Sequence, residues 1–146
     1  MARAREIGLD YKSYASVRAA SGHDVVAFLF STNALRLRAP LPRLPVERAA
    51  KLAALRACGR LAVAQAPLSP EVVAAALGPV IDALHSAPRA HATFAQSGAA
   101  LRAALGALPG SGVVLVGDTW AEAEWCSAAR LAAYLPADLF FAQPVR

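Results

Sequence analysis

The sequence predicts an α/β domain in three layers, with a mostly parallel sheet between two layers of helices. Short apolar runs alternate along the chain with helical segments of roughly ten to eighteen residues, which is the pattern of successive strand–helix–strand units. The clearest of these runs are apolar at every position, as expected for strands that are covered on both faces. Because crossovers between parallel strands are right-handed, helices then lie on both faces of a Rossmann-like sheet.

The strands are predicted where apolar runs meet turn-forming residues. Residues 25–30 and 113–116 are continuous apolar runs rich in Val, Leu and Phe, and residues 61–64 and 139–141 are shorter runs of the same kind. Residues 78–88 leave two alternatives open, a further strand that begins near Val80 or another turn of helix. The sheet therefore has four predicted strands and one undecided segment.

The predicted helices begin at residues that can cap a helix N-terminus. Asp10 and Ser69 have side chains of the preferred kind, and Ser69 is followed by Pro and Glu, which favour a first helical turn. Thr93 with Gln96, and Thr119 with Glu122, have the spacing of a capping box. The predicted helices cover residues 10–20, 45–58, 69–77, 93–108 and 119–135.

The length and composition fit one domain with a substantial core. The chain has 146 residues, of which 57% are hydrophobic and 17% charged, so it is too apolar to be disordered. We expect an N-terminal helical arm over residues 1–22, followed by a single α/β domain over residues 23–146. No apolar run approaches the roughly 20 residues that a membrane span needs.

The cysteines and histidines do not have the pattern of a cross-linked or zinc-bound scaffold. Cys58 and Cys126 are too few for a disulfide framework, and they favour a reducing, intracellular location, either the cytoplasm or an organelle matrix. His23, His85 and His91 have no spacing that would bring three or four ligands to a zinc ion.

Polar residues follow the strand predicted at residues 113–116. Gly117 and Asp118 come directly after it, and Glu122 lies four residues beyond Asp118. This arrangement resembles the fourth motif of the haloacid dehalogenase (HAD) superfamily of phosphohydrolases, whose acids hold Mg²⁺ in active members. The resemblance makes Asp118 and Glu122 candidate metal ligands. The alternative is that they only stabilise a helix N-terminus, with Thr119 as its cap.

The first predicted strand is similar to the same family in rhythm but not in chemistry. The family's strand ends in Asp-x-Asp-x-Thr, and the alignment puts Leu29 in place of the nucleophilic Asp and Ser31 in place of the general acid. A leucine neither attacks phosphorus nor binds Mg²⁺. Gln65 stands where the family has a Ser or Thr, and Arg89 or Arg102 would have to replace the family's Lys.

The resemblance therefore implies a degenerate HAD-like domain that lacks the nucleophilic Asp. It is also capless, because residues 31–44, with their prolines, leave room for at most a flap or a short exposed strand at 35–38. We expect a non-catalytic binding, regulatory or assembly subunit that contacts a protein partner or a second copy and uses no cofactor. The alternative is a Mg²⁺-dependent HAD-type phosphatase or hydrolase whose carboxylates are Asp24 and Asp118.

Basic residues are concentrated in the first part of the chain. Residues 1–60 contain eleven Lys and Arg against four acids, whereas the remainder contains four Arg against six acids. Such a surface can meet nucleic acid or an acidic protein, or it can be a set of solvated helix faces. The nucleic-acid alternative would use Arg36, Arg38, Arg43, Arg48 and Arg56. The candidate residues for a protein partner are Arg36, Arg38, Arg43, Arg48, Trp120 and Trp125.

Overall fold

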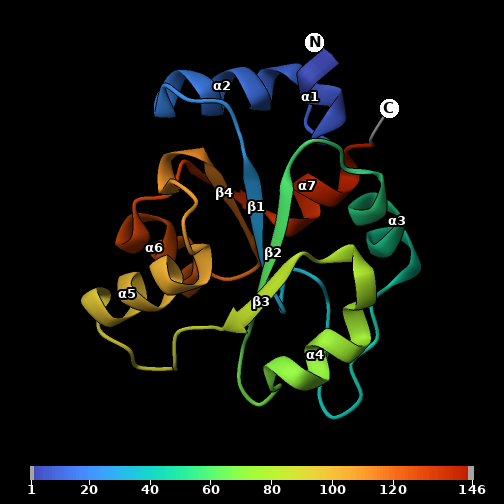
Figure 1. The fold of residues 1–146 in the computed structure, drawn as a ribbon, viewed down its shortest axis with the longest axis vertical. Coiled ribbons are helices and arrows are strands. Elements are labelled where there is room, and N and C mark those ends of the chain that lie inside the picture. The colour runs from blue at the N-terminus through green and yellow to red at the C-terminus, as the bar shows by residue number, and fades with distance from the viewer. Residues whose placement is uncertain (1, 145–146) are drawn as a thin grey trace.

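Five parallel strands form the centre of the molecule in a computed structural model that describes residues 2–144 (Figure 1). The strands are β1 (Ala27–Ser31), β2 (Gly59–Ala64), β3 (Ala83–Ser86), β4 (Val113–Gly117) and β5 (Ala133–Pro136). Their order in the sheet is β3-β2-β1-β4-β5, and every neighbouring pair is parallel. The order reverses beside β1, as in doubly wound sheets. The predicted three-layer, Rossmann-like α/β fold is confirmed.

Helices cover both faces of the sheet. They are α1 (Ala2–Glu6), α2 (Tyr11–Ser21), α3 (Val46–Ala54), α4 (Pro70–Leu77), α5 (Phe94–Leu105), α6 (Trp120–Ala129) and α7 (Ala137–Ala142). Figure 1 shows α5 and α6 on one side of the sheet, α3, α4 and α7 on the other, and α1 and α2 above the end where β1 begins. No helix in residues 2–144 is long and apolar enough to cross a membrane.

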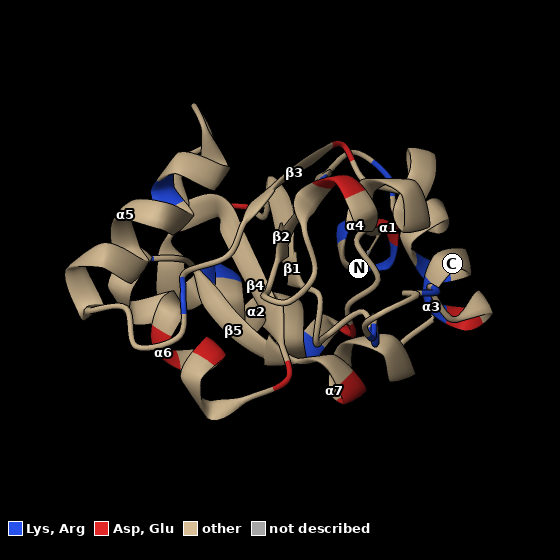
Figure 2. Ribbon diagram, turned by 90° about the horizontal axis from the view of Figure 1, so that it is seen from below, with Lys and Arg blue, Asp and Glu red and all other residues tan. Residues whose placement is uncertain are grey.

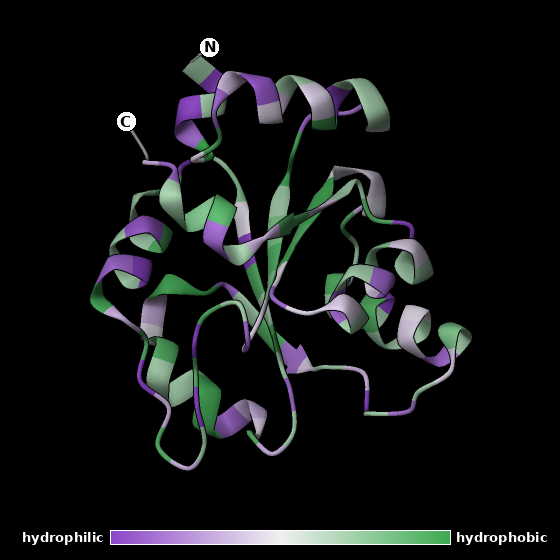
Figure 3. Ribbon diagram, turned by 180° about the vertical axis from the view of Figure 1, so that it is seen from behind, coloured by the Kyte–Doolittle hydropathy of each residue, from purple (hydrophilic) through white to green (hydrophobic). Residues whose placement is uncertain are grey.

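The two faces of β1 belong to two separate hydrophobic clusters. Phe28 and Phe30 point to one face, where their rings lie 5.0 Å and 5.7 Å from the ring of Phe140 in α7. Leu29 points to the other face and packs under α5 and α6. All five residues of β1 are buried, and Figure 3 shows the hydrophobic colour on the central strands. This two-sided burial explains why the strand is apolar at every position.

The N-terminal arm is fastened to the end of the sheet where the strands begin. The Arg3 guanidinium donates to the Asp24 carboxylate at 3.1 Å and to the Val25 carbonyl at 2.7 Å. The Tyr14 hydroxyl donates to Asp24 at 2.9 Å. Ile7 is fully buried within the larger cluster, so the arm contributes to the core of the domain.

The C-terminal part of the chain differs from its sequence-based prediction. The helix predicted to reach residue 135 ends at Ala129, because Arg130 takes a left-handed conformation with φ of 55° and its N–H caps the helix. Residues 133–136 then pair with β4, with Leu135 opposite Val116. The predicted strand at 139–141 lies in α7, so that prediction was wrong. The free edge of β4 is thus paired with residues 133–136, which come before residues 139–141 in the chain.

Two further segments also differ from expectation. Helix α3 ends at Ala54 rather than near Cys58, and β2 begins at Gly59, two residues before the predicted strand. At residues 35–38 there is a turn and no strand, because Leu35 and Leu37 are buried in the larger cluster rather than exposed. The undecided segment at 78–88 contains a short 3-10 helix (Gly78–Val80) and then β3.

Lys51 of α3 is buried beneath the arm and α7. Its ammonium donates to the Gly8 carbonyl at 2.8 Å and to the Phe140 carbonyl, and it lies 3.7 Å from the centroid of the Phe140 ring. Burial lowers the pKa of Lys51 to about 7. The pKa of a lysine in the unfolded chain is near 10.4, so between these values the unfolded state binds more protons than the folded state.

We therefore expect the free energy of unfolding to rise with pH just above neutrality. Between about pH 7.5 and 8.5 the increase should be roughly 1 kcal/mol. Replacement Lys51→Met should abolish this slope, whereas Lys12→Met, at an exposed lysine, should keep it. Urea unfolding at several pH values measures both slopes. The range stops below pH 9 because burial raises the pKa of Cys58 to about 11, which gives the opposite slope at higher pH. Equal slopes in the two variants would contradict the assignment.

Candidate functional site

The reversal of strand order places the carboxyl ends of β1 and β4 side by side. Phe30 pairs with Val116, so the residues that follow each strand emerge at the same edge of the sheet. Figure 2 views the molecule from this edge. The chain leaves β1 toward α3 on one face and leaves β4 toward α6 on the other face. In doubly wound sheets this divergence opens a crevice in which ligands bind.

The Glu122 carboxylate lies between the ends of β1 and β4, where such a crevice would open, and it is fully buried. It accepts hydrogen bonds from the Ser31 hydroxyl, the Asn33 amide at 2.9 Å, the Thr119 hydroxyl at 2.7 Å and the Asp118 N–H at 3.1 Å. Burial opposes the charged form, but these four donors together lower the pKa of Glu122. The carboxylate is therefore an anion at neutral pH, held by neutral donors from two strand ends.

Gly117 makes room for the Glu122 side chain. A Cβ atom at this position would lie 3.1 Å from a Glu122 carboxylate oxygen and 2.7 Å from the Tyr134 ring. The Thr119 hydroxyl accepts from the Glu122 N–H at 3.3 Å, so one half of the predicted capping box is present. The Glu122 carboxylate does not complete the other half. It reaches across to β1, so its contacts exceed those of a helix cap.

Gln65, at the end of β2, fixes the segment that follows β1. Its side-chain carbonyl accepts from the Thr32 hydroxyl at 3.0 Å and from the Asn33 N–H at 2.9 Å. Its own N–H donates to the Thr32 hydroxyl at 3.1 Å. Three strand ends are thus tied together by side-chain hydrogen bonds, with Asn33 shared between Gln65 and Glu122.

Arg36 closes the crevice on its outer side. Its guanidinium donates to Asp118 at 2.9 Å and to Asp138 at 2.8 Å, which joins the segments after β1, β4 and β5. Arg48 approaches Asp138 at 3.7 Å while its guanidinium lies 4.2 Å from the centroid of the Phe141 ring. Both aspartates at this edge are therefore paired with arginine.

The residues present do not fit a Mg²⁺ site of the kind that the resemblance implies. Both Glu122 oxygens accept hydrogen bonds from protein donors, and the Asp118 carboxylate is paired with the Arg36 guanidinium. Mg²⁺ is bound by carboxylates together with water or substrate oxygens, and a guanidinium in that position competes with it. Within residues 2–144, no group of three or more His, Cys, Asp or Glu side chains is arranged to hold a metal ion.

Leu29 does not lie at the crevice. It is fully buried two residues before the end of β1, between Leu61 of β2 and Leu115 of β4. The side chains that reach the crevice from β1 are those of Ser31 and Asn33. Sequence reasoning missed Asn33, although a polar pair spaced two residues apart directly after an apolar strand could have indicated it.

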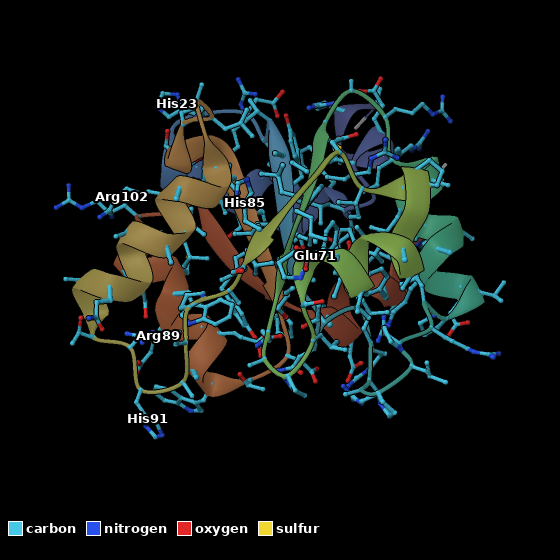
Figure 4. The ribbon with its side chains drawn as sticks, turned by 60° about the horizontal axis from the view of Figure 1, so that its bottom comes forward. His23, Glu71, His85, Arg89, His91 and Arg102 are labelled. Atoms are coloured by element: carbon cyan, nitrogen blue, oxygen red, sulfur yellow. The ribbon has the colours of Figure 1, made fainter. Side chains whose placement is uncertain are left out.

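The remaining polar residues named from the sequence do not converge on this crevice. Asp24 precedes β1 and is bound by Arg3 and Tyr14 at the opposite end of the sheet from Asp118. Figure 4 shows His23, His85 and His91 well apart from one another. Arg102 lies on α5, where it donates to the Ala128 carbonyl at 3.3 Å, and Arg89 follows β3.

The candidate contact residues fall into two groups. Arg38, Arg43 and Trp120 are exposed. Arg48 and Trp125 are buried, and Arg36 is held in its ion pairs. Arg56 lies just before β2, at the other end of the sheet from the segment after β1, so the five arginines form no continuous stripe. Figure 2 likewise shows basic and acidic segments interspersed.

Comparison with known proteins gives no match: no family model, no curated protein and no solved structure is similar enough to place the chain in a family. The class of protein is therefore defined by the fold and the crevice alone. It is a doubly wound α/β domain whose switch-point crevice is filled by its own polar side chains.

We expect Glu122→Gln to destabilise the protein by about 2–4 kcal/mol, because an amide cannot accept all four hydrogen bonds and a buried donor without an acceptor costs about 1–3 kcal/mol. The control is Glu124→Gln, an exposed position on the same helix, which should change stability by less than about 0.5 kcal/mol. Urea unfolding at neutral pH gives both values.

Acidification should reduce the difference in the free energy of unfolding between the wild type and Glu122→Gln. The folded-state pKa of Glu122 is lowered, so its contribution is present above its unfolded pKa of about 4.3 and is lost as pH falls through the folded value. The stability gap between the wild type and Glu122→Gln should therefore narrow below about pH 4. A gap that stays constant down to the acid transition would show that Glu122 is not an anion in the folded state.

Proposed function

We propose that this protein is a non-catalytic, HAD-like α/β domain that acts as a binding, regulatory or assembly subunit through protein contacts. The observation that carries the proposal is the saturation of Glu122 by four protein donors. A catalytic carboxylate must remain available to a substrate, a proton or a metal. Here the buried carboxylate serves the fold.

The chemistry of the β1 end supports the same proposal. The pair that reaches Glu122 from this end is Ser31 and Asn33 rather than Leu29 and Ser31, and neither member provides a carboxylate. The Ser31 hydroxyl donates to Glu122 and accepts from the Ala34 N–H at 3.0 Å, so both of its hydrogen-bonding roles are used. Within residues 2–144, neither hydrogen-bond partner of the Ser31 hydroxyl is a histidine or lysine that could act as a base. An activated nucleophile needs such a neighbour.

The surface for a partner is best placed around the carboxyl edge of the sheet. Large apolar side chains that are exposed on segments following strands include those of Trp120 (82% exposed), Leu41 (79%) and Leu139 (49%). Trp120 begins α6 and Leu139 lies next to Asp138 of the Arg36 network. Exposed aromatic and aliphatic residues bordered by paired charges are typical of protein-contact surfaces.

A phosphatase assay tests the absence of catalysis. We expect generic phosphoesters with millimolar Mg²⁺ to give no turnover above background, and no rise in melting temperature on adding Mg²⁺, since a ligand that binds the folded state would stabilise it. Turnover that is abolished in Asp118→Asn would overturn the proposal in favour of a hydrolase.

The contact surface is tested with a second copy of the chain as the partner. We expect the wild type to self-associate at micromolar concentration in sedimentation velocity. Trp120→Ser should raise the dissociation constant of the self-associated form by about tenfold or more. Tyr11→Ser, at a 55% exposed aromatic on α2, is the matched control and should behave as the wild type. Equal dissociation constants for the two variants would show that Trp120 does not lie in the contact surface.

A further inference from the structure

A cavity of about 320 Å³ lies beside the polar cluster, on the α5 and α6 side of the sheet. Its walls come from the end of β2, the loop between β3 and α5, the start of α5, and α6. Its size is at the lower end of the range for small-molecule sites, which is about 300–1,000 Å³. The cavity is distinct from the Glu122 crevice, although Gln65 lines it and also binds Asn33.

The packing of α5 against α6 explains why the cavity exists. The two helices touch at Gly98, where a Cβ atom would lie only 2.4 Å from the Ala128 carbonyl oxygen. Toward the carboxyl edge, the loop before α5 and the first turn of α6 carry small side chains, such as Ala92 and Ala121. Because these alanines are too small to reach across, a space remains that no side chain fills.

The base of the cavity is aromatic. Trp125 lines it while remaining 8% exposed, and Ser97 lies beside it with similar burial. Phe94 stands at the mouth and is 63% exposed, which is unusual for a phenylalanine. A flat apolar ring entering the cavity would therefore find one aromatic surface at its base and another at its entrance.

The rim of the cavity favours a negative charge. Arg89 and His91 lie on the loop between β3 and α5 (Figure 4), and among the described residues the Arg89 guanidinium has no acidic partner. Helix α5 begins at the same rim. Its capping box pairs Thr93 with Gln96 and leaves the Phe94 N–H without an acceptor in residues 2–144. A helix N-terminus and a free guanidinium both attract anions.

Two further groups can orient a ligand. The Gln65 side-chain carbonyl is held by Thr32 and Asn33, so its NH₂ group is fixed and donates to no other group within the described chain. On the opposite wall, the Glu124 carboxylate is exposed and can accept from a hydroxyl or amine. The site thus offers an aromatic base, a cationic rim, one fixed donor and one acceptor.

We propose that this cavity binds a small planar aromatic anion. The ring would pack on Trp125, and a carboxylate or phosphate on the ring would pair with Arg89 at the start of α5. This inference is independent of the proposed function, because it concerns a different set of side chains and requires no catalysis.

Calorimetric titration with four probes tests the chemistry. Adenosine 5′-monophosphate and benzoate carry both a ring and an anion, whereas adenosine and inorganic phosphate carry one each. We expect at least one of the first two to bind, and about tenfold more tightly than adenosine or phosphate. The phosphate and carboxylate probes distinguish the two anion sources. No binding of either at millimolar concentration, or equal binding of phosphate alone, would overturn the proposal.

Variants locate the binding in the cavity. Arg89→Gln should weaken the anionic probe about tenfold, whereas Arg43→Gln, the same charge change on an exposed loop elsewhere, should not. Ala121→Leu should fill the cavity and abolish binding, and Ala99→Leu, at an exposed position on α5, should leave it unchanged. Both substituted sites are exposed, so unfolding curves should match the wild type. Binding that survives in Ala121→Leu would place it outside the cavity.

The two tryptophans provide an independent signal. In Trp120→Phe protein, Trp125 is the remaining indole, and the emission it gives reports on the base of the cavity alone. We expect the bound probe to quench or shift this emission with the same dissociation constant as calorimetry. An unchanged emission at saturation would exclude packing of the ring on Trp125 and would overturn the proposed pose.

Discussion

A single buried negative charge ties the strand ends of this fold together. Moving a carboxylate out of water is costly, and the cost is offset only when its oxygens are fully hydrogen-bonded. Glu122 meets this condition with donors from the ends of β1 and β4, and Asn33 extends the connection to Gln65, which directly follows β2. The carboxyl ends of the three central strands are therefore fixed relative to one another by side-chain hydrogen bonds as well as by backbone pairing.

The same constraint explains the chemistry of the edge around it. Glu122 can stay charged inside the protein because Ser31, Asn33 and Thr119 are neutral donors that need no counter-ion of their own. The charges at the surface are balanced separately, by Arg36 between Asp118 and Asp138. In an open crevice these groups would face a ligand, whereas here they face one another. A doubly wound fold by itself thus carries little weight for activity, which depends on the groups that remain free.

Local signals predicted most of the fold, and long-range pairing decided the remainder. Asp10 and Thr93 cap α2 and α5 as their side chains suggest, and Gly22 ends α2 with φ of 74°. At the C-terminal end, an alanine-rich stretch looks helical through residue 135. Arg130 ends the helix in a left-handed conformation, which is not a preferred conformation for arginine and so could not be predicted from the residue type. The gain is a fifth strand on β4, which becomes visible only when the sheet is assembled.

The candidate site was predicted in part, for similar reasons. Asp118 and Glu122 were expected at one strand end, and they lie there. The partners of Glu122 on β1 could not be derived, because the sequence does not say how far a strand continues beyond its apolar run. One polar residue, Ser31, completes β1, and this extension moves the crevice-facing position from Leu29 to Ser31 and Asn33.

Gly98 has a consequence that reaches beyond its own helix. It lies at the contact between α5 and α6, where the backbones of the two helices meet without a side chain between them. Any larger residue there would clash with the Ala128 carbonyl and push the two helices apart at this contact. The distance between the cavity walls is thus set by a residue that does not line the cavity, so the size of an acceptable guest could change without altering one contact residue.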